Sequence, residues 1–294
     1  MVRKYKIHTN LDGNDNQIID LTNGKIRLYQ PSDLGIVTNT NIWSSQGLGV
    51  FGDTAISHPS MDFRLETFGD NLQENYNLMN NFVSLILAQK YVTIEYTSEM
   101  GTFYADVKLA KVSKTKGYGQ SGTFSETISF DVINKWYVYE ALTFTSFTEG
   151  ELTETSKIYS NSRYTYTDTA YTYYSEDNAE RFSKWLIKEG IFSFVARLTP
   201  SNSKETKYGL RFLDEQANEY TSIILNLTNK PDYIQLNSDV NDEYYQASTA
   251  NTVVNMFSAL DFQKFRTRIF KKGTMELVNL ETVEMNVKRK VDFV

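Results

Sequence analysis

The sequence predicts a mainly β protein of two domains. Its 294 residues include 20 tyrosines and 18 phenylalanines but only 3 tryptophans and 4 prolines, a composition that suits half-buried strands better than packed helices. Hydrophobic residues make up 40% of the chain, which is enough to form a sizeable core. Several segments alternate apolar and polar residues with a period of two, as strands do when one face is buried and the other meets water.

The first half of the chain carries most of the clear alternating segments. Glu126 is the only polar residue on the apolar face of its segment. The strands predicted here are residues 25–28, 61–66, 92–96, 103–109 and 124–132.

Residues 70–89 form the one convincing helical pattern. Asp70 is expected to cap the first turn, after Gly69 provides the entry, and Glu74 adds negative charge near the positive end of the helix dipole. The helix is amphipathic, so we expect it to pack on a sheet or on a neighbouring subunit. Its predicted apolar face consists of Leu72, Tyr76, Met79, Val83, Ile86 and Leu87.

The pattern changes near residue 140, where a Thr/Glu-rich stretch begins. We therefore predict a first domain at residues 1–140 and a second at 141–294. Short strands separated by turn residues predict a β-sandwich for the second domain. A short helix is predicted within this domain at residues 176–185, before the strands that begin at residue 191. Whether residues 283–294 stay with this domain or return to the first is left open. The strands predicted here are residues 191–198, 208–213, 220–227, 233–237, 265–270, 275–280 and 283–293.

Charge and composition exclude several classes of protein. The net charge of −6 argues against a nucleic-acid binder, because affinity for phosphates comes from clustered Lys and Arg. Residues 288–290, KRK, lie in an alternating segment and are expected on the wet face of a strand. The longest apolar stretch, residues 82–88, is too short to span a membrane. No apolar region follows the charged residues 1–6, so no signal peptide is expected. The absence of cysteine removes disulfides, thiolate nucleophiles and Cys-ligated metals, and indicates folding in a reducing compartment.

Two glycine-rich segments match the dinucleotide-binding pattern G-x-G-x-x-G. They are residues 47–52, GLGVFG, and residues 117–122, GYGQSG. A dinucleotide site needs such a loop between a parallel strand and a helix, so that the pyrophosphate meets the helix N-terminus. Neither segment precedes a helical pattern, and we interpret both as turns between strands.

Histidines and acidic clusters give no complete catalytic or metal motif. His8 and His58 are the only histidines, and without partner motifs we interpret both as ordinary surface or turn residues. Residues 12–16 and 239–243 begin like calcium loops but lack the glycine and the final glutamate of an EF-hand. Solvated turns explain both clusters, and an irregular calcium site remains an alternative. With 36 acidic residues, no glycosidase-type carboxylate pair is selected. No catalytic, cofactor-binding or metal-binding residue is therefore assigned.

A tyrosine-rich segment at residues 159–174 has three interpretations. Its rings could stack on sugars, form a protein-binding surface, or be half-buried strand residues. The sequence leaves the three open.

The order of short segments along the whole chain resembles the distal tail proteins (Dit) of phages with long non-contractile tails, most closely those of lactococcal phages. The resemblance rests on the order and the amino-acid sequences of these segments and not on a catalytic signature. In the first half the segments are residues 23–27, 41–43, 62–69, 116–119, 122–126 and 130–136, and in the second half residues 183–185, 208–214, 266–269 and 288–294.

The resemblance implies a structural protein that is not an enzyme and needs no cofactor. The N-terminal β-sandwich, with its helix and an extended hairpin, would join five further copies in a hexameric ring under the tail tube that lets DNA pass. The C-terminal domain would be galectin-like, with an extension that holds trimers of the receptor-binding protein. The expected partners are therefore the tail-tube protein, the tail-associated (tail tip) protein and the receptor-binding protein, in a virion baseplate assembled in the host cytoplasm.

Two further points follow from the resemblance. Residues 141–294 contain no histidine, so we do not expect galectin sugar chemistry in the second domain. The extension is expected within the least regular segments, residues 199–207 or 238–260. The alternative function is a carbohydrate-binding module or adhesin that contacts the host cell wall directly, with Trp185 and the tyrosines as stacking groups.

Overall fold

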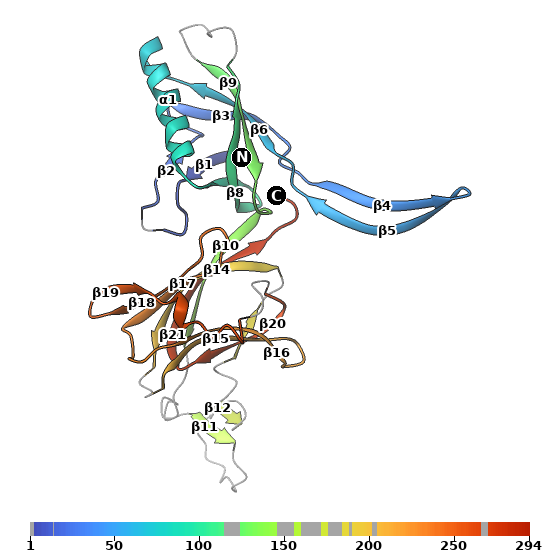
Figure 1. The fold of residues 1–294 in the computed structure, drawn as a ribbon. Coiled ribbons are helices and arrows are strands. Elements are labelled where there is room, and N and C mark those ends of the chain that lie inside the picture. The colour runs from blue at the N-terminus through green and yellow to red at the C-terminus, as the bar shows by residue number, and fades with distance from the viewer. Residues whose placement is uncertain are drawn as a thin grey trace. The chain divides into compact units, whose positions relative to one another are not determined.

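A computed structural model describes the chain as two compact units, Met1–Tyr139 with Lys290–Val294, and Glu140–Arg289 (Figure 1). The mainly β fold predicted from the sequence is confirmed, with one α-helix among the described residues. Those residues are 3–13, 15–114, 124–145, 156–159, 172–175, 184–187, 190–201, 205–265 and 270–294.

The first unit is built on one antiparallel sheet that buries alternate residues. On β6 (Met61–Thr67), Met61, Phe63 and Leu65 are all buried, while the residues between them are half-buried or exposed. Glu126 is buried on the same face of its strand as Ile128, as its position in the alternating pattern implies. The sheet order is β2 (Ile18–Asp20), β1 (Lys4–His8), β7 (Val92–Ser98), β8 (Gly101–Val112), β9 (Ser125–Val132), β6 and β3 (Ile26–Ser32).

Helix α1 (Leu72–Ala88) packs on the core of this unit with a face that differs in part from the predicted one. Phe82 and Ile86 are buried in the core, and Met79 and Val83 lie against it. The predicted face is therefore confirmed at Met79, Val83 and Ile86 but not at its other three positions, although the ring of Tyr76 still packs edge-on against Phe124 with 4.6 Å between centroids. Leu72, Tyr76 and Leu87 are all exposed.

The N-terminus of α1 is capped one residue later than predicted. The side chain of Asn71, not Asp70, accepts a hydrogen bond from the backbone N–H of Glu74 at 2.9 Å. Glu74 in turn accepts from the backbone N–H of Asp70 at 2.6 Å, so the first turn resembles a capping box. Gly69 does lead into the helix, and its N–H donates to Asn75 at 2.7 Å.

The second unit is a sandwich of two sheets around one core. Its first sheet has the order β19 (Thr252–Asn255), β18 (Tyr244–Thr249), β17 (Tyr233–Asn237), β14 (Ile191–Pro200), β21 (Leu280–Lys290) and β10 (Tyr137–Thr145). The second sheet has the order β13 (Lys184–Ile187), β20 (Gly273–Val278), β15 (Lys207–Leu213) and β16 (Glu219–Asn226). A short parallel pair, β11 (Ser156–Tyr159) and β12 (Thr172–Ser175), forms a separate sheet.

Aromatic side chains from both sheets meet in the core of the second unit. The ring centroids of Phe194 and Phe212 lie 4.8–5.0 Å from that of Phe270. Deleting a buried aromatic ring of this kind costs about 3–5 kcal/mol. The core therefore joins the two layers through apolar packing.

Two predictions for the second unit need correction. The helix predicted at residues 176–185 does not extend to Trp185, which lies in β13, and residues 176–183 fall outside the described part. Residues 238–260 are not irregular, because they contain β18, β19 and a 3₁₀ turn at Phe257–Ala259. The strand predicted at residues 265–270 stays a prediction, because residues 266–269 lie outside the described part.

The chain end divides between the units. β21 pairs with β14 along most of its length and ends at Lys290. The N–H of Val291 then donates to the carbonyl of Trp136 at 2.6 Å, and Asp292 forms an ion pair with Lys135 at 3.1 Å. The last strand thus belongs to the second unit, and the final residues return to the first.

We expect the variant Asn71→Ala to lower the free energy of unfolding by about 1 kcal/mol, because a helix N–H loses its cap. The neighbouring variant Asp70→Ala removes an exposed carboxylate and should cost less than about 0.5 kcal/mol. Urea denaturation of both variants checks this, and equal losses would contradict the assignment of Asn71 as the cap.

Candidate functional site

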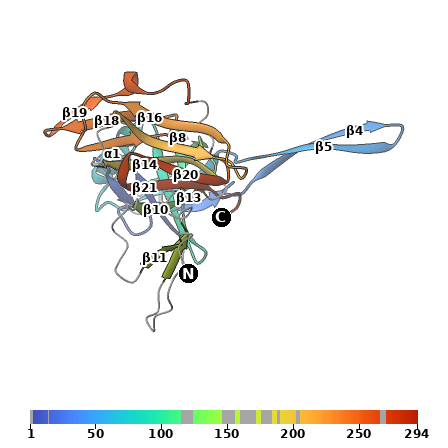
Figure 2. The same cartoon turned by 90° about the horizontal axis from the view of Figure 1, so that it is seen from below.

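The most unusual surface of the first unit is a long two-stranded hairpin. β4 (Val37–Ser45) and β5 (Leu48–Ser57) pair with each other and with no other described strand, and Figures 1 and 2 show them as a separate ribbon. The two-residue turn consists of Gln46 and Gly47, with φ of 51° and 83°. Positive φ at both central residues matches the right-handed twist of a hairpin.

The first glycine motif is explained by this hairpin. Gly47 lies in the turn, where its positive φ is free of steric cost. A Cβ at Gly52 would lie 2.9 Å from the Trp43 ring and 2.9 Å from the carbonyl of Asn41, so the close packing of Trp43 needs a glycine. The interpretation of residues 47–52 as a turn is confirmed for Gly47, whereas residues 48–52 lie in β5. The second motif, residues 117–122, lies outside the described residues.

Both faces of the hairpin expose large apolar side chains. Trp43 pairs across the strands with Val50 on one face, and Ile42 pairs with Phe51 on the other. The exposed fractions are 64% for Trp43, 71% for Phe51 and 75% for Leu48 beside the turn. Soluble proteins rarely leave such patches uncovered, and a lone hairpin is marginally stable in water. The hairpin therefore has the exposed apolar chemistry that is typical of an interface element.

His8 is buried, contrary to its interpretation as a surface or turn residue. It lies at the end of β1 with 4% of its surface exposed, and its Nε2 is 2.7 Å from a carboxylate oxygen of Glu95. Asn16 Nδ2 can only donate, so His8 Nδ1 accepts that bond at 3.0 Å and Nε2–H donates to Glu95. Lys6 donates to the other oxygen of Glu95 at 2.8 Å. All of these groups are engaged with one another, in a pattern that ties β1 to β7.

His58 is half-buried beside the base of the hairpin. Its Nδ1 is 3.2 Å from the carbonyl of Gly35, to which it donates. Burial lowers the pKa of His58, and the hydrogen bond to Gly35 offsets this only in part. Nothing in these contacts gives His58 a catalytic partner among the described residues.

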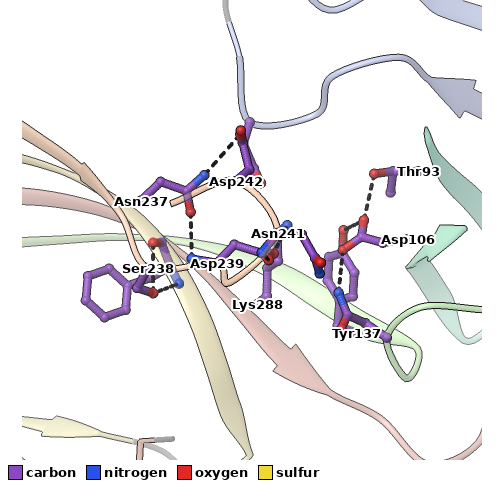
Figure 3. Close-up of polar contacts among 12 residues, drawn as sticks. Thr93, Asp106, Tyr137, Asn237, Ser238, Asp239, Asn241, Asp242 and Lys288 are labelled. Atoms are coloured by element: carbon purple, nitrogen blue, oxygen red, sulfur yellow. Dashed lines mark hydrogen bonds and ion pairs between the residues drawn. The ribbon is translucent and has the colours of Figure 1, made fainter. Parts of the chain in front are cut away.

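The second acidic cluster, residues 239–243, is a turn as predicted, but its first carboxylate is not solvated. Asp239 is buried, and its two carboxylate oxygens accept from the N–H of Asn241 at 2.9 Å and from Lys288 Nζ at 3.1 Å (Figure 3). Asn237 accepts from the N–H of Asp239 at 2.9 Å and lies 3.4 Å from Asp242. The ammonium of Lys288 thus sits where a cation would be expected.

Lys288 also corrects a prediction about its strand. The lysine was expected on a wet face, yet its side chain is 1% exposed and paired with Asp239. Arg289 is half-buried and forms an ion pair with Glu140 at 2.6 Å. Only Lys290 of the three basic residues is exposed.

The first acidic cluster is also engaged internally. Asp15 accepts from Asn10 at 2.6 Å, and Asp12 accepts from the hydroxyl of Tyr139 at 2.8 Å. Residue 14 lies outside the described part. In the part of the chain that the structure describes, no group of three His, Asp or Glu side chains is placed to hold a metal ion.

Asp106 forms a buried polar cluster that sequence reasoning missed. Its carboxylate accepts from Thr93 at 2.7 Å, Tyr137 at 2.8 Å and Asn134 at 3.0 Å (Figure 3). These contacts join β7 and β8 to the start of β10. The sequence carried no signal for this, because Asp106 occupies a position that reads as solvent-facing. The side chains of the tyrosine-rich segment, residues 159–174, lie outside the described part, and so does the side chain of Trp185.

The Glu95 cluster generates a pH prediction. Burial raises the pKa of Glu95, but the hydrogen bonds from Lys6 and His8 outweigh it and hold the pKa below the ordinary 4.5. A lowered folded-state pKa contributes stability above pH 4.5 that is lost as the pH falls through the folded-state value. We expect Glu95→Gln to cost about 1–2 kcal/mol at neutral pH and to converge with the parent protein in acid.

Urea denaturation at a series of pH values measures this convergence. Glu215→Gln, in an exposed pair with Lys272, is the control and should change stability little at any pH. A cost of Glu95→Gln that stays constant from neutral to strongly acid pH would contradict the role of the carboxylate.

The buried pair of Lys288 and Asp239 generates a second prediction. Lys288→Met or Asp239→Asn alone leaves one buried partner uncompensated and should cost about 3–5 kcal/mol. The double variant should cost clearly less than the sum of the two. Lys135→Met is a matched control, because its ion pair with Asp292 has the same 3.1 Å length but is exposed. Additive single losses in a double-mutant cycle would contradict the coupling.

The described residues contain no helix that is long and apolar enough to cross a membrane.

The chain is similar to known phage proteins over its whole length. It is 52% identical to the distal tail proteins of Lactococcus phage SK1 and Lactococcus phage p2, with 100% of each chain covered. Among solved structures it matches a chain of the phage P2 baseplate in its activated conformation with Ca, at 52% identity, full coverage of both chains and a TM-score of 0.84.

A more distant match extends the likeness in fold alone. The SPP1 Dit protein has 11% identity, a TM-score of 0.55, and coverage of 98% of this chain and 99% of that one. Two family models also match, the N-terminal domain of the distal tail protein at residues 4–133 and the C-terminal domain of Dit at residues 135–294. Together they account for nearly every residue, and the chain therefore belongs to the distal tail protein (Dit) family.

Proposed function

We propose that this protein is the structural hub of a phage tail-tip baseplate and acts as a hexameric ring. The observation that carries the proposal is the hairpin, whose two faces expose Trp43, Leu48 and Phe51. A free-standing apolar ribbon gains stability only when another surface covers it. The proposed cover is the next copy of the same chain.

The geometry of such a contact favours a ring. The hairpin of one copy would lie on a different surface of its neighbour, so the interface is head-to-tail and each copy both gives and receives a hairpin. Head-to-tail contacts close into a ring when the rotation between copies is a simple fraction of a turn. Strands of 9 and 10 residues reach about 30 Å, which is long enough to extend across the surface of a neighbouring domain.

The proposed ring connects the tail tube to the receptor-binding proteins and lets DNA pass. Its proposed partners are the tail-tube protein, the tail-associated protein and trimers of the receptor-binding protein, joined in the host cytoplasm before release. A charge of −6 per copy gives the six copies about −36, so the ring has no overall attraction for a phosphate backbone. The role is structural and requires no catalytic group.

The mass in solution tests the ring. Light scattering after size-exclusion chromatography should give about 200 kDa, six times 33.9 kDa, for the chain alone, or a larger mass that contains six copies of the chain when its tail-tube protein is present. The variants Trp43→Ser and Phe51→Ser should shift the population to monomers while the fold is retained, because both side chains are exposed in the single chain.

Met100→Ser is the matched control, because Met100 is 85% exposed but lies in the turn between β7 and β8. It should leave the ring intact. A chain that remains monomeric even with its tail-tube protein would overturn the proposal. A ring that is indifferent to both hairpin variants would show that the hairpin is not its interface.

A further inference from the structure

The outer face of the first sheet of the second unit contains a shallow groove. It has a volume of about 280 Å³ and lies over five adjacent strands, β18, β17, β14, β21 and β10. All of its lining residues belong to the second unit. Those with polar side chains are Thr143, Arg197, Gln235, Tyr244, Glu284 and Asn286.

One arginine and one glutamate face each other on this surface without forming an ion pair. Arg197 on β14 and Glu284 on β21 are register partners, and both are exposed. The Arg197 guanidinium instead lies 4.0 Å from the ring centroid of Tyr233. Stacking occupies the flat face of a guanidinium but leaves its N–H donors available in the ring plane. The carboxylate of Glu284 remains a strong acceptor beside it.

Side-chain amides complete the lining on both flanks. Gln235 is the register partner of Arg197 on β17, and Asn286 lies two residues beyond Glu284 on β21. Each side-chain amide carries an NH2 donor group and a carbonyl acceptor on the same carbon atom. Together with the charged pair, they form a row of alternating donors and acceptors next to the ring of Tyr244.

This lining distinguishes among classes of ligand. The one positive and one negative side chain cancel, so the groove has no charge for a nucleic-acid or phosphate ligand. An extended peptide would add to a sheet at a free edge, whereas β17, β14 and β21 lie inside the sheet with neighbours on both sides. A neutral saccharide matches best, because its adjacent hydroxyls each donate and accept and its C–H face packs on aromatic rings.

We propose that this groove binds one or two units of a neutral saccharide chain. Arg197, Gln235, Glu284 and Asn286 supply the hydrogen bonds, and Tyr244 supplies the apolar contact. Its described lining residues differ from residues 159–174 and Trp185, to which the sequence pointed for sugar stacking. It adds a direct glycan contact to the proposed role as a hub and does not depend on ring closure.

Titration calorimetry and saturation-transfer NMR on the full chain test the proposal. The probes are neutral tetrasaccharides of glucose, galactose, mannose and N-acetylglucosamine. At least one should bind, and Arg197→Ala, Gln235→Ala and Asn286→Ala should each weaken it by about tenfold, the usual effect of removing one well-placed hydrogen bond.

Gln216→Ala is the matched control for Gln235→Ala, because Gln216 is exposed in the turn between β15 and β16. It should leave the affinity unchanged. Thermal unfolding and the mass in solution should be the same for all variants, which separates loss of the site from loss of the fold or of the ring. Failure of all four probes to bind, or binding that survives the groove substitutions, would overturn the proposal.

Discussion

Burial of one face of each antiparallel sheet is the constraint on which this structure depends. In the first unit, alternate residues such as Met61, Phe63 and Leu65 enter a core that helix α1 completes with Phe82. In the second unit, two sheets share a single core between them. Because a strand has only two faces, this arrangement determines which side chains are left outside. The surfaces that bind other molecules must be made from those that remain.

The hairpin is the place where this rule is not met within one chain. Neither β4 nor β5 has a buried face. In the single chain, burial of apolar surface therefore does not offset the conformational entropy that the two strands lose on becoming ordered. Membership of the distal tail protein family gives this exposure a reason, since these proteins work in multi-chain assemblies such as the phage P2 baseplate. Two glycines of the segment that resembles a nucleotide-binding loop serve this hairpin. Gly47 allows the turn, and Gly52 allows the close packing of Trp43.

Polar groups inside the units are the second consequence of tight sheet packing. Asp106, Lys288 and Glu95 lie on strands and are almost fully buried. Each has partners on neighbouring strands or loops, so burial does not leave a charge uncompensated. Such pairs also favour one register over another, because a slip of one residue would bury each charge alone. They serve the fold, and none of the three lines the groove over β14 and β21.

The sequence by itself determined the fold class, many of the strands and helix α1, because period-two and period-3.6 patterns depend only on local side-chain order. The family followed from the resemblance of short segments along the chain. Tertiary structure decided what depends on neighbours distant in the chain. It buried His8 against Glu95 and Lys288 against Asp239, whose partners are 87 and 49 residues away. It also left Leu72 and Leu87 of the helix exposed. Periodicity shows that a residue can face a core, but only packing decides whether a partner or the solvent meets it.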